Sequence, residues 1–335
     1  MVMKQQVVIF GTGTHYLHHK YLLDNTWEVI AFADNDINKI GKKFEGKKVI
    51  AASELTNNLK YSYIVVATTA KDQVIKQLLG MGISNEKIKV LNCYGLVEPQ
   101  FVKTEVLQDG RTLFQIEDIS FYCDTRSDYG VAQELYDDGI YYFKQNKYKY
   151  IVIDVGMNTA MAALYFAQNS WVTKVYGYEP FKETYLQAIQ NIELNSNEIQ
   201  NKILTYNYGL DNKASTKQIN YCAEVSGGMS TEYETSIMSA NTTQVILKKA
   251  ELVLEEIIKT HSNNKILLKV DCEGSEYSIF TDLFNSKLLN NIDVILMEWH
   301  DAKRNKLLEK QLLESGFVFV KKIGNEGRGF IYATR

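Results

Sequence analysis

The stretch Ile151-Val-Ile-Asp-Val-Gly-Met-Asn-Thr-Ala160 is the part of this sequence that decides its fold. Its apolar residues are typical of a strand buried on both faces, and Gly156 then marks a sharp turn. A second apolar strand, Val175-Tyr-Gly-Tyr-Glu-Pro180, ends on Glu179, 25 residues after Asp154. That spacing suits one strand–helix–strand unit, which sets a glycine turn beside an acid at the carboxyl edge of a parallel sheet. We therefore expect a nucleoside-bearing ligand at this edge.

Apolar runs along the rest of the chain predict an α/β fold with two Rossmann-like halves. In the second half we expect a hairpin at the end of the chain, and the further strands are 203–208, 265–271, 293–298, 317–321 and 329–334. The first half alternates strands with helices, which implies a small parallel sheet with right-handed crossovers. Its expected strands are 7–11, 29–33, 46–50, 63–67 and 87–91, and its expected helices are 14–23 and 71–81.

With 335 residues the chain is too long for one ordinary core, and we divide it into three parts. Residues 1–95 are expected to form a Rossmann-like N-terminal domain, 96–149 a connector and lid, and 150–335 the second domain. Within the connector we expect a hairpin around Asp109-Gly110 and a tyrosine-rich helix over 128–146.

Composition excludes several classes of function. Hydrophobic residues make up 45% of the chain and charged residues 23%, and the formal net charge is −3. These values are typical of a globular protein and give no basic footprint for nucleic acid. The sequence has no signal-peptide pattern and no apolar run long enough to span a bilayer. The scattered cysteines are typical of free thiols, so we expect a cytoplasmic protein without nucleic-acid partners, for which a homo-oligomer is compatible with the sequence.

The turn after the first strand offers three candidate cofactor-binding residues. Gly156 has no Cβ and so permits a close ligand approach. Asp154 can hold an ammonium group or its water, and Asn158 can cap the next helix or bond a ligand. At the end of the second strand, Glu179 can accept hydrogen bonds from ribose hydroxyls. The alternatives are a tight turn that binds nothing and, for Glu179, a surface acid before Pro180.

A second group of acids lies in Lys269-Val-Asp-Cys-Glu-Gly-Ser-Glu-Tyr277. Asp271, Glu273 and Glu276 are crowded at the end of an expected strand, which is unfavourable unless a cation, proton or donor separates them. The next strand ends at Met297-Glu-Trp-His300 and brings an imidazole to the same edge. These residues predict a loop that positions a substrate or provides a base; the alternative is a set of solvated acids at a helix N-terminus.

Residues 150–335 resemble the FkbM family of S-adenosylmethionine-dependent methyltransferases. The segments that carry the resemblance are Ile153–Asn158, Val175–Pro180, Asn191–Asn195, Leu268–Tyr277 and Leu296–His300. The resemblance implies a class I methyltransferase fold: a seven-stranded sheet with a terminal β-hairpin. It also implies that the methionine end of the cofactor lies at Asp154–Asn158, its ribose on Glu179 and its adenine near Tyr208–Asp211, so that Asp211 joins the cofactor-binding candidates.

Members of that family typically methylate hydroxyl groups of sugars or secondary metabolites, which implies a small-molecule or glycan acceptor and a place in polysaccharide biosynthesis. The sequence departs from the family at Met157, where a small residue is common, and at Ala160, where a third glycine is common. We expect both to tighten the cofactor turn without removing its essential groups.

Methyl transfer needs an aligned acceptor and a general base, because the sulfonium methyl is already activated. Asp271 and His300 are our first candidates for the base, and Glu273 is the third. A divalent metal could bridge these acids to a sugar diol, but no ligand spacing demands one, so none is counted among the expected cofactors. The segment Ser226-Gly-Gly-Met-Ser230 can line the acceptor pocket or merely connect two strands.

The N-terminal part carries Gly11-Thr-Gly-Thr-His-Tyr16, which has the first two glycines of a dinucleotide motif and Tyr16 in place of the third. Asp34 follows Gly11 by 23 residues, a distance suited to a ribose contact. The segment resembles the Rossmann-like domain that precedes sugar-modifying transferases, which implies that Gly11, Gly13 and Asp34 bind a nucleotide or nucleotide sugar. The alternative is a domain that keeps the fold and binds nothing.

Three hypotheses follow for the whole chain. The first is an S-adenosylmethionine-dependent O-methyltransferase acting on a carbohydrate, a nucleotide sugar or a secondary metabolite. The second is an NAD(P)-dependent sugar oxidoreductase that uses Gly11, Gly13 and Asp34. The third is a non-catalytic nucleotide-binding or scaffold protein.

Overall fold

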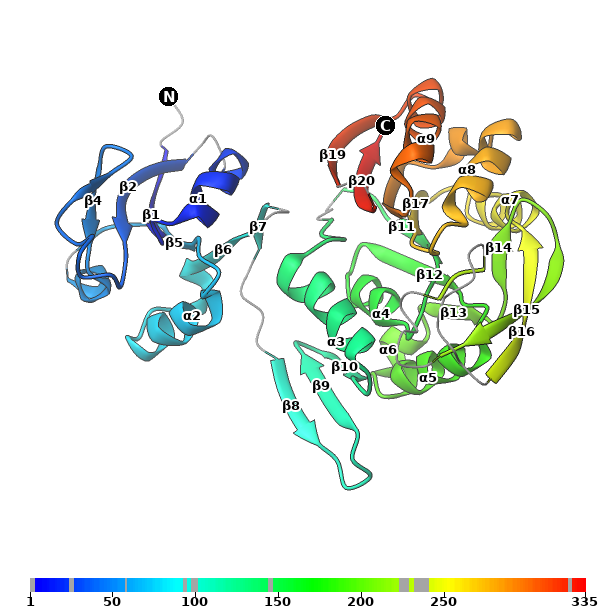
Figure 1. The fold of residues 1–335 in the computed structure, drawn as a ribbon, viewed down its shortest axis with the longest axis horizontal. Coiled ribbons are helices and arrows are strands. Elements are labelled where there is room, and N and C mark those ends of the chain that lie inside the picture. The colour runs from blue at the N-terminus through cyan, green and yellow to red at the C-terminus, as the bar shows by residue number, and fades with distance from the viewer. Residues whose placement is uncertain are drawn as a thin grey trace. The chain divides into compact units, whose positions relative to one another are not determined.

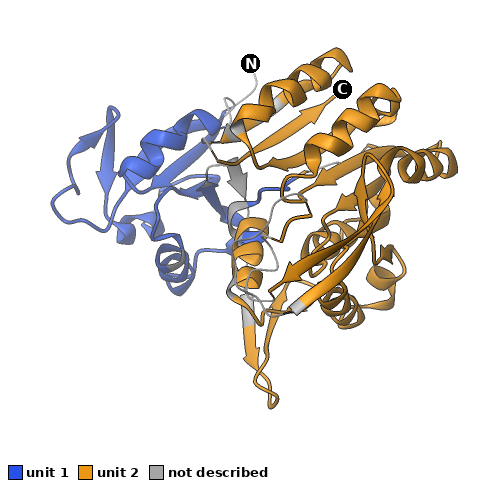
Figure 2. Cartoon of the chain, turned by 45° about the vertical axis from the view of Figure 1, so that its right-hand side comes forward, with its two compact units in different colours: residues 1–101, 136–142 blue, residues 102–135, 143–335 orange. Residues whose placement is uncertain are grey.

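A computed structural model describes residues 4–23, 27–57, 59–92, 95–97, 102–143, 147–222, 229–231, 241–324 and 327–335. The chain divides into two compact units, coloured separately in Figure 2. Unit 1 comprises residues 1–101 and 136–142, and unit 2 comprises residues 102–135 and 143–335.

Unit 1 contains a seven-stranded sheet in the order β3-β4-β2-β1-β5-β6-β7. Its strands are β1 Gln5–Phe10, β2 Trp27–Ala33, β3 Lys43–Phe44, β4 Lys47–Ile50, β5 Tyr63–Val66, β6 Ile88–Asn92 and β7 Gly95–Val97. The helical elements are α1 Thr14–His19, η1 Lys20–Leu22, η2 Ala52–Thr56, α2 Lys71–Gly80 and η3 Asn85–Lys87. Strands β4, β2, β1, β5 and β6 run parallel, as the alternating sequence pattern predicts. Alternate residues of β1 enter two separate apolar clusters, so the sheet is covered on both faces.

Unit 2 is built on a second seven-stranded sheet in the order β13-β12-β11-β17-β18-β20-β19 (Figure 1). Its strands are β11 Tyr150–Val155, β12 Val172–Tyr178, β13 Ile203–Tyr206, β17 Lys265–Val270, β18 Val294–Trp299, β19 Val318–Gly324 and β20 Gly329–Thr334. The first five are parallel, and β20 pairs antiparallel with both β18 and β19. The expected sheet with a terminal hairpin is therefore confirmed.

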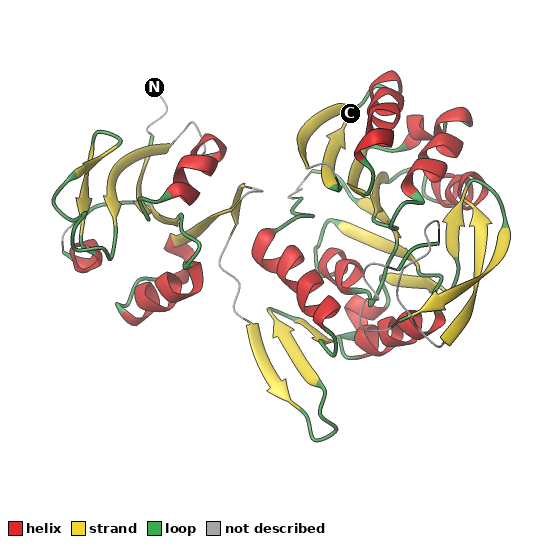
Figure 3. Ribbon diagram, viewed as in Figure 1, coloured by secondary structure: helices red, strands yellow, loops and turns green. Residues whose placement is uncertain are grey.

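Helices cover both faces of this sheet (Figure 3). They are α4 Met161–Ala167, α5 Lys182–Glu193, α6 Asn197–Gln200, α7 Ala250–Thr260, α8 Glu276–Asn285, η6 Leu288–Asn291 and α9 Ala302–Glu314. Apolar residues of α7, α8 and α9 share one core cluster with alternate residues of β11, β17 and β18, while α4 lies against β11, β12 and β13. Because both faces are covered, every residue of β11 is buried, as its apolar sequence predicts.

A three-stranded sheet in unit 2 was not predicted from the sequence. It consists of β14 Gly209–Asp211, β16 Asn241–Lys249 and β15 Ser215–Tyr221, in that order. Strand β15 is largely polar and only its last residue is buried, so it lacks the apolar run that marked the other strands.

The segment before the large sheet of unit 2 contains β8 Val102–Val106, β9 Thr112–Ile116, β10 Ile119–Tyr122, α3 Arg126–Ala132 and the π-helical turn Gln133–Asp138. The hairpin predicted around Asp109-Gly110 is confirmed, because β8 and β9 are antiparallel. The helix expected over 128–146 is shorter and starts earlier. Side chains of α5 and of the turn after it hold β10 in place: Asn191 accepts a hydrogen bond from the N–H of Tyr122 (2.8 Å), and Asn195 bonds both backbone polar groups of Ser120 (2.9 and 2.8 Å).

Candidate functional site

The turn between β11 and α4 is shaped by the protein itself. Gly156 has φ +78°, and a Cβ at this position would lie 1.7 Å from the backbone oxygen of Asp271. The N–H groups of Gly156 and Met157 donate to the carbonyl oxygen of Tyr178 at 3.1 and 3.0 Å. The glycine is therefore required by the close approach of the segment after β17, in addition to the ligand access that the sequence predicts.

Two more residues of this turn adopt left-handed backbone conformations. Asn158 has φ +50° and Ala160 has φ +66°. Asparagine tolerates this region, whereas alanine is strained there by roughly 1–2 kcal/mol. This conformation explains in physical terms why glycine would suit position 160.

Asp154 faces an ammonium group that belongs to the protein. Its carboxylate is fully buried and lies 3.0 Å from Nζ of Lys269, which is also buried. The two residues are paired in register across β11 and β17. Lys269 also donates to the carbonyl oxygen of Gly156 at 2.7 Å, so it links Asp154 to the turn. Burial lowers the pKa of Lys269, but the charges of Asp154 and Asp271 outweigh it and raise the pKa, which keeps the lysine protonated.

Lys269 is a structural residue that sequence reasoning missed. A lysine in a strand usually marks an exposed position, and only its place after the buried leucines of β17 signalled that it lies inside.

Glu179 lies at the end of β12, next to the turn. It is 5% exposed and accepts hydrogen bonds from the N–H groups of Asn158 and Phe181, both at 2.9 Å. Burial raises the pKa of Glu179 to about 7, although these two N–H groups lower it. An ionised carboxylate has about four acceptor positions, so the two backbone bonds leave room for a diol.

Asp211 lies on β14. It is buried and accepts hydrogen bonds from Oγ of Ser278 on α8 (2.6 Å) and from the N–H of Asn212 (2.7 Å). Asp211 is therefore connected to α8. The other four cofactor-binding candidates are connected to one another around the turn: Asp154, Gly156, Asn158 and Glu179.

The predicted catalytic residues come together at the carboxyl ends of β17 and β18. Nε2 of His300 lies 3.4 Å from Oε2 of Glu273 and 3.8 Å from Oε1 of Glu298, and Nδ1 lies 3.4 Å from Oε1 of Glu276. One ligand atom each from Asp271, Glu273 and His300 lies within 4.8 Å of the others. Glu276 is fully buried, and its carboxylate accepts hydrogen bonds from the N–H groups of Gly274 (2.7 Å) and His300 (2.8 Å). We call Asp271, Glu273, Glu276, Glu298 and His300 the acid cluster.

Crowding of charge shifts the pKa values within the acid cluster. Burial lowers the pKa of His300, but Glu276, Glu273 and Asp271 outweigh it and raise the pKa to about 9. Burial and neighbouring acids raise the pKa of Glu273 to about 7 and that of Glu298 to about 8, although His300 opposes both shifts. The raised pKa favours a protonated imidazole at neutral pH, and the role of general base expected for His300 stays a prediction.

The segment expected to line an acceptor pocket, 226–230, is described only from Met229 onward. Oγ of Ser230 donates to the carbonyl oxygen of Glu273 at 2.6 Å, and Oγ1 of Thr231 lies 2.8 Å from Oγ of Ser275. The end of this segment thus contacts the loop that carries Glu273.

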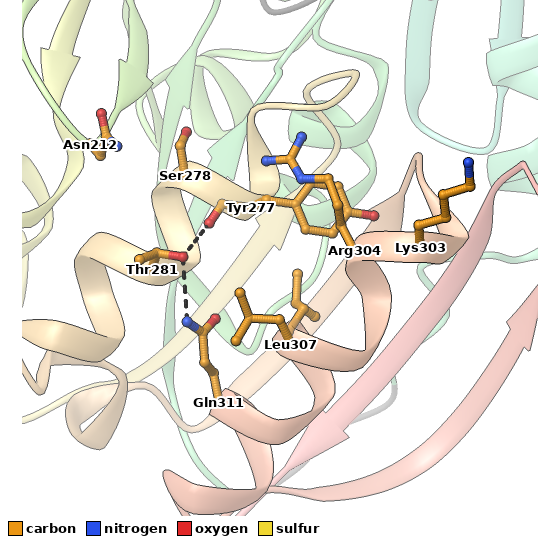
Figure 4. Close-up of a pocket in the computed structure, with 9 residues that line it drawn as sticks. Asn212, Tyr277, Ser278, Thr281, Lys303, Arg304, Leu307 and Gln311 are labelled. Atoms are coloured by element: carbon orange, nitrogen blue, oxygen red, sulfur yellow. Dashed lines mark hydrogen bonds between the residues drawn. The ribbon is translucent and has the colours of Figure 1, made fainter.

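A pocket of about 450 Å³ opens beside α8 and α9 (Figure 4). The guanidinium of Arg304 lies over the ring of Tyr277, 4.1 Å from its centroid, and the amide of Gln311 donates to Thr281 at 3.4 Å. The lining of this pocket combines cationic, hydroxyl, amide and apolar side chains: Asn212, Tyr277, Ser278, Thr281, Lys303, Arg304, Leu307, Leu308 and Gln311. This chemistry suits a polar or anionic ligand.

In unit 1, the candidate nucleotide residues lie at the ends of β1 and β2. Gly11 has φ +117°, and a Cβ there would lie 2.6 Å from the backbone oxygen of Ala67, whereas a Cβ on Gly13 would meet open space. The carboxylate of Asp34 already accepts hydrogen bonds from the N–H and hydroxyl of Thr12, and it pairs with Lys39 at 3.1 Å. A nucleotide would therefore have to share Asp34 with these partners.

Among the described residues, no helix is both long and apolar enough to cross a bilayer.

A family model described as the methyltransferase FkbM domain matches residues 154–319, and one described as C2185-like, N-terminal, matches residues 3–89. No curated protein matches the chain.

The solved structures that the chain matches are distant in sequence. The methyltransferase FkbM from Methylobacillus flagellatus KT is 13% identical over 98% of this chain and 90% of that chain, with a TM-score of 0.36. A protein of the NADB-Rossmann superfamily from Streptococcus agalactiae is 12% identical over 59% and 66%, with a TM-score of 0.34. A ribosomal protein L11 methylase from Lactobacillus delbrueckii subsp. bulgaricus is 13% identical over 55% and 69%, with a TM-score of 0.30.

Proposed function

Residues 154–319 of this chain belong to the FkbM methyltransferase family, and on that premise we propose that it methylates a hydroxyl oxygen of a carbohydrate, a nucleotide sugar or a related secondary metabolite. The family implies S-adenosylmethionine as the methyl donor. Bound at the turn, the cofactor supplies a methyl group that is already activated by the sulfonium.

The observation that carries this proposal is the arrangement of Glu179 beside the turn. Its carboxylate is buried at the end of β12, is held by two backbone N–H groups, and keeps acceptor capacity for ribose hydroxyls. Oδ1 of Asn158 is buried and has no hydrogen-bond partner among the described residues. A buried acceptor without a partner is unfavourable, and the cofactor's ammonium group would satisfy it. The residues present therefore fit the cofactor.

The acid cluster lies at the ends of β17 and β18, which are one and two strands away from β11 in the sheet. We expect the acceptor hydroxyl to meet the methyl group there. For methyl transfer from a bound cofactor, a carboxylate of this cluster would take up the proton that the acceptor hydroxyl gives up. We assign this role to Asp271 or Glu273, because the raised pKa of His300 favours an imidazole that already carries its proton when no cation is bound.

The pocket beside α8 and α9 supports an acceptor with an anionic group. It presents Lys303 and Arg304 together with hydroxyl and amide groups, which match a phosphorylated or acidic sugar. A nucleotide sugar or an acidic polysaccharide precursor has both the hydroxyl to be methylated and the negative charge.

Incubation with S-adenosylmethionine and a panel of such sugars, followed by mass spectrometry, tests the proposal. We expect a product 14 Da heavier than the acceptor and an equal amount of S-adenosylhomocysteine, both lost in Asp271→Asn or Glu273→Gln. Exposed Glu314 on α9 offers the control variant Glu314→Gln, which should keep full activity. Glycerol-type diols methylated as well as sugars would contradict the assigned acceptor class.

For unit 1 we propose a supporting role, the binding of a nucleotide or nucleotide sugar at Gly11, Gly13 and Asp34. The parallel β1 and β2 strands and the open space at Gly13 support it. Calorimetry with uridine diphosphate sugars and with NADH tests it, because NADH binding alone would favour the oxidoreductase alternative. We also propose a cytoplasmic location, which the free thiols of Cys123, Cys222 and Cys272 support.

A further inference from the structure

Three potential metal ligands from two neighbouring strands converge in the acid cluster. Asp271 and Glu273 follow β17, and His300 follows β18, which pairs in parallel with β17. His300 lies 27 positions after Glu273 and 29 positions after Asp271 in the sequence, yet all three residues reach one point of the sheet edge. They offer two carboxylate oxygens and one imidazole nitrogen.

The distances among these atoms suit one bound ion. Donor atoms about 2.1 Å from a common ion are separated by roughly 3.0 Å when adjacent and about 4.2 Å when opposite in an octahedron. Nε2 of His300 lies 3.4 Å from Oε2 of Glu273, and all three ligand atoms lie within 4.8 Å of one another. Small side-chain rotations therefore bring them into a coordination sphere.

Glu276 supplies a second indication, because its carboxylate lies beside the ring nitrogen of His300 that faces away from Glu273. Its buried carboxylate lies 3.4 Å from Nδ1 of His300, while Nε2 points towards Glu273 and Glu298. A carboxylate on one ring nitrogen and a metal on the other is a recurring arrangement in metalloproteins. Glu276 also accepts the N–H groups of Gly274 and His300, so it fixes both ligand-bearing segments.

The charge balance of the acid cluster points the same way. The acid cluster gathers four carboxylates around one imidazole, and a bound cation would neutralise this concentration of negative charge. Lys269 lies 3.9 Å from Asp271 but is closer to Asp154, and the side chain of Arg328, which pairs with Glu298, is 63% exposed.

We propose that Asp271, Glu273 and His300 bind one divalent cation that accepts mixed oxygen and nitrogen ligands, such as Mn²⁺. The sequence left such a cation open, because no ligand spacing demanded one. The cation would lie where the acceptor hydroxyl is expected and would lower the pKa of a bound hydroxyl; this use of the cation rests on the proposed function, but its binding does not.

Electron paramagnetic resonance of the chelator-treated full-length protein titrated with Mn²⁺ tests the proposal. We expect one site of micromolar affinity, with affinity at least tenfold lower in Glu273→Gln and unchanged in Glu314→Gln. Pulsed measurements should show coupling to a nitrogen nucleus, and His300→Ala should remove it. Circular dichroism and the melting temperature of each variant establish that it is folded.

No binding at 1 mM Mn²⁺, or equal binding by folded Glu273→Gln and wild type, would overturn the metal site. S-adenosylmethionine titrated into the same samples separates the two proposals. Cofactor binding without Mn²⁺ binding refutes only the metal site, and Mn²⁺ binding without cofactor binding refutes only the proposed function.

Discussion

Replacing Lys269 with methionine removes the ammonium group that contacts the buried carboxylate of Asp154 and the carbonyl oxygen of Gly156. Methionine keeps the length and apolar stem of lysine, so the change is chiefly one of charge. We expect unit 2 to lose a large part of its stability at neutral pH, because removing one partner of a buried ion pair typically costs about 3–5 kcal/mol.

The expected loss of stability has an electrostatic part and a hydrogen-bond part. At a separation of 3.0 Å, the attraction between Lys269 and Asp154 is about 5.5 kcal/mol at an effective dielectric constant of 20. Without the lysine, Asp154 can instead take up a proton. Protonating a carboxyl group of ordinary pKa at pH 7 costs about 4 kcal/mol, and this cost sets the upper limit of the electrostatic loss. The lost hydrogen bond to Gly156 adds about 1 kcal/mol. We therefore expect a total loss of about 5 kcal/mol.

The loss of stability in Lys269→Met should depend on pH. In the variant, the folded protein carries a proton on Asp154 that the unfolded chain releases above pH 4. The pKa is thus raised by folding, and this contribution to stability grows as pH falls. At pH 5 protonation costs only about 1.5 kcal/mol, so the difference between variant and wild type should shrink to about 2.5 kcal/mol.

Urea unfolding followed by tryptophan fluorescence measures both losses. Of the three tryptophans, Trp27 lies in unit 1, so a Trp27→Phe background restricts the signal to unit 2. The matched control is Lys265→Met on the same strand; that lysine is 45% exposed and pairs with Asp293, so its loss should cost below about 1 kcal/mol. A loss below about 1.5 kcal/mol for Lys269→Met at pH 7, or an equal loss at pH 5, would refute the buried ion pair.

Three further predictions concern the turn and its supports. Gly156→Ala should destabilise unit 2 by more than about 3 kcal/mol, read from urea unfolding, because its Cβ would overlap the backbone oxygen of Asp271; a loss under 1 kcal/mol would contradict this. The affinity for S-adenosylmethionine should rise about tenfold from pH 6 to pH 8, because ribose hydroxyls donate to ionised Glu179 and its pKa is raised to about 7; calorimetry should find this dependence absent in Glu179→Gln. Asn191→Ala should cost about 2–4 kcal/mol, because it leaves the N–H of Tyr122 and the carbonyl of Thr159 without their partner; a melting temperature within 2 °C of wild type would argue against it.

The sequence was informative where apolar strands end on a functional residue. The β11 and β12 runs located Asp154, Gly156 and Glu179, because parallel strands bring consecutive ends to one edge. The pairing of Lys269 with Asp154 could not be predicted, because it depends on which strand inserts between β11 and β18 and on its register.

The acid cluster shows the same limit. The chain pattern predicted that acids and His300 would meet at one edge, but the state of the imidazole depends on the position of the buried carboxylate of Glu276. The small sheet that carries Asp211 also escaped prediction, since its strand β15 is largely polar and only its last residue is buried.

Titration calorimetry of S-adenosylmethionine with wild type, Glu179→Gln and the exposed control Glu193→Gln tests the central claim most directly. We predict one site in wild type and in the control, and an affinity at least tenfold lower in Glu179→Gln. The absence of binding to wild type at 1 mM cofactor, or equal affinity in all three proteins, would contradict a methyl-donor site at the β11–β12 edge.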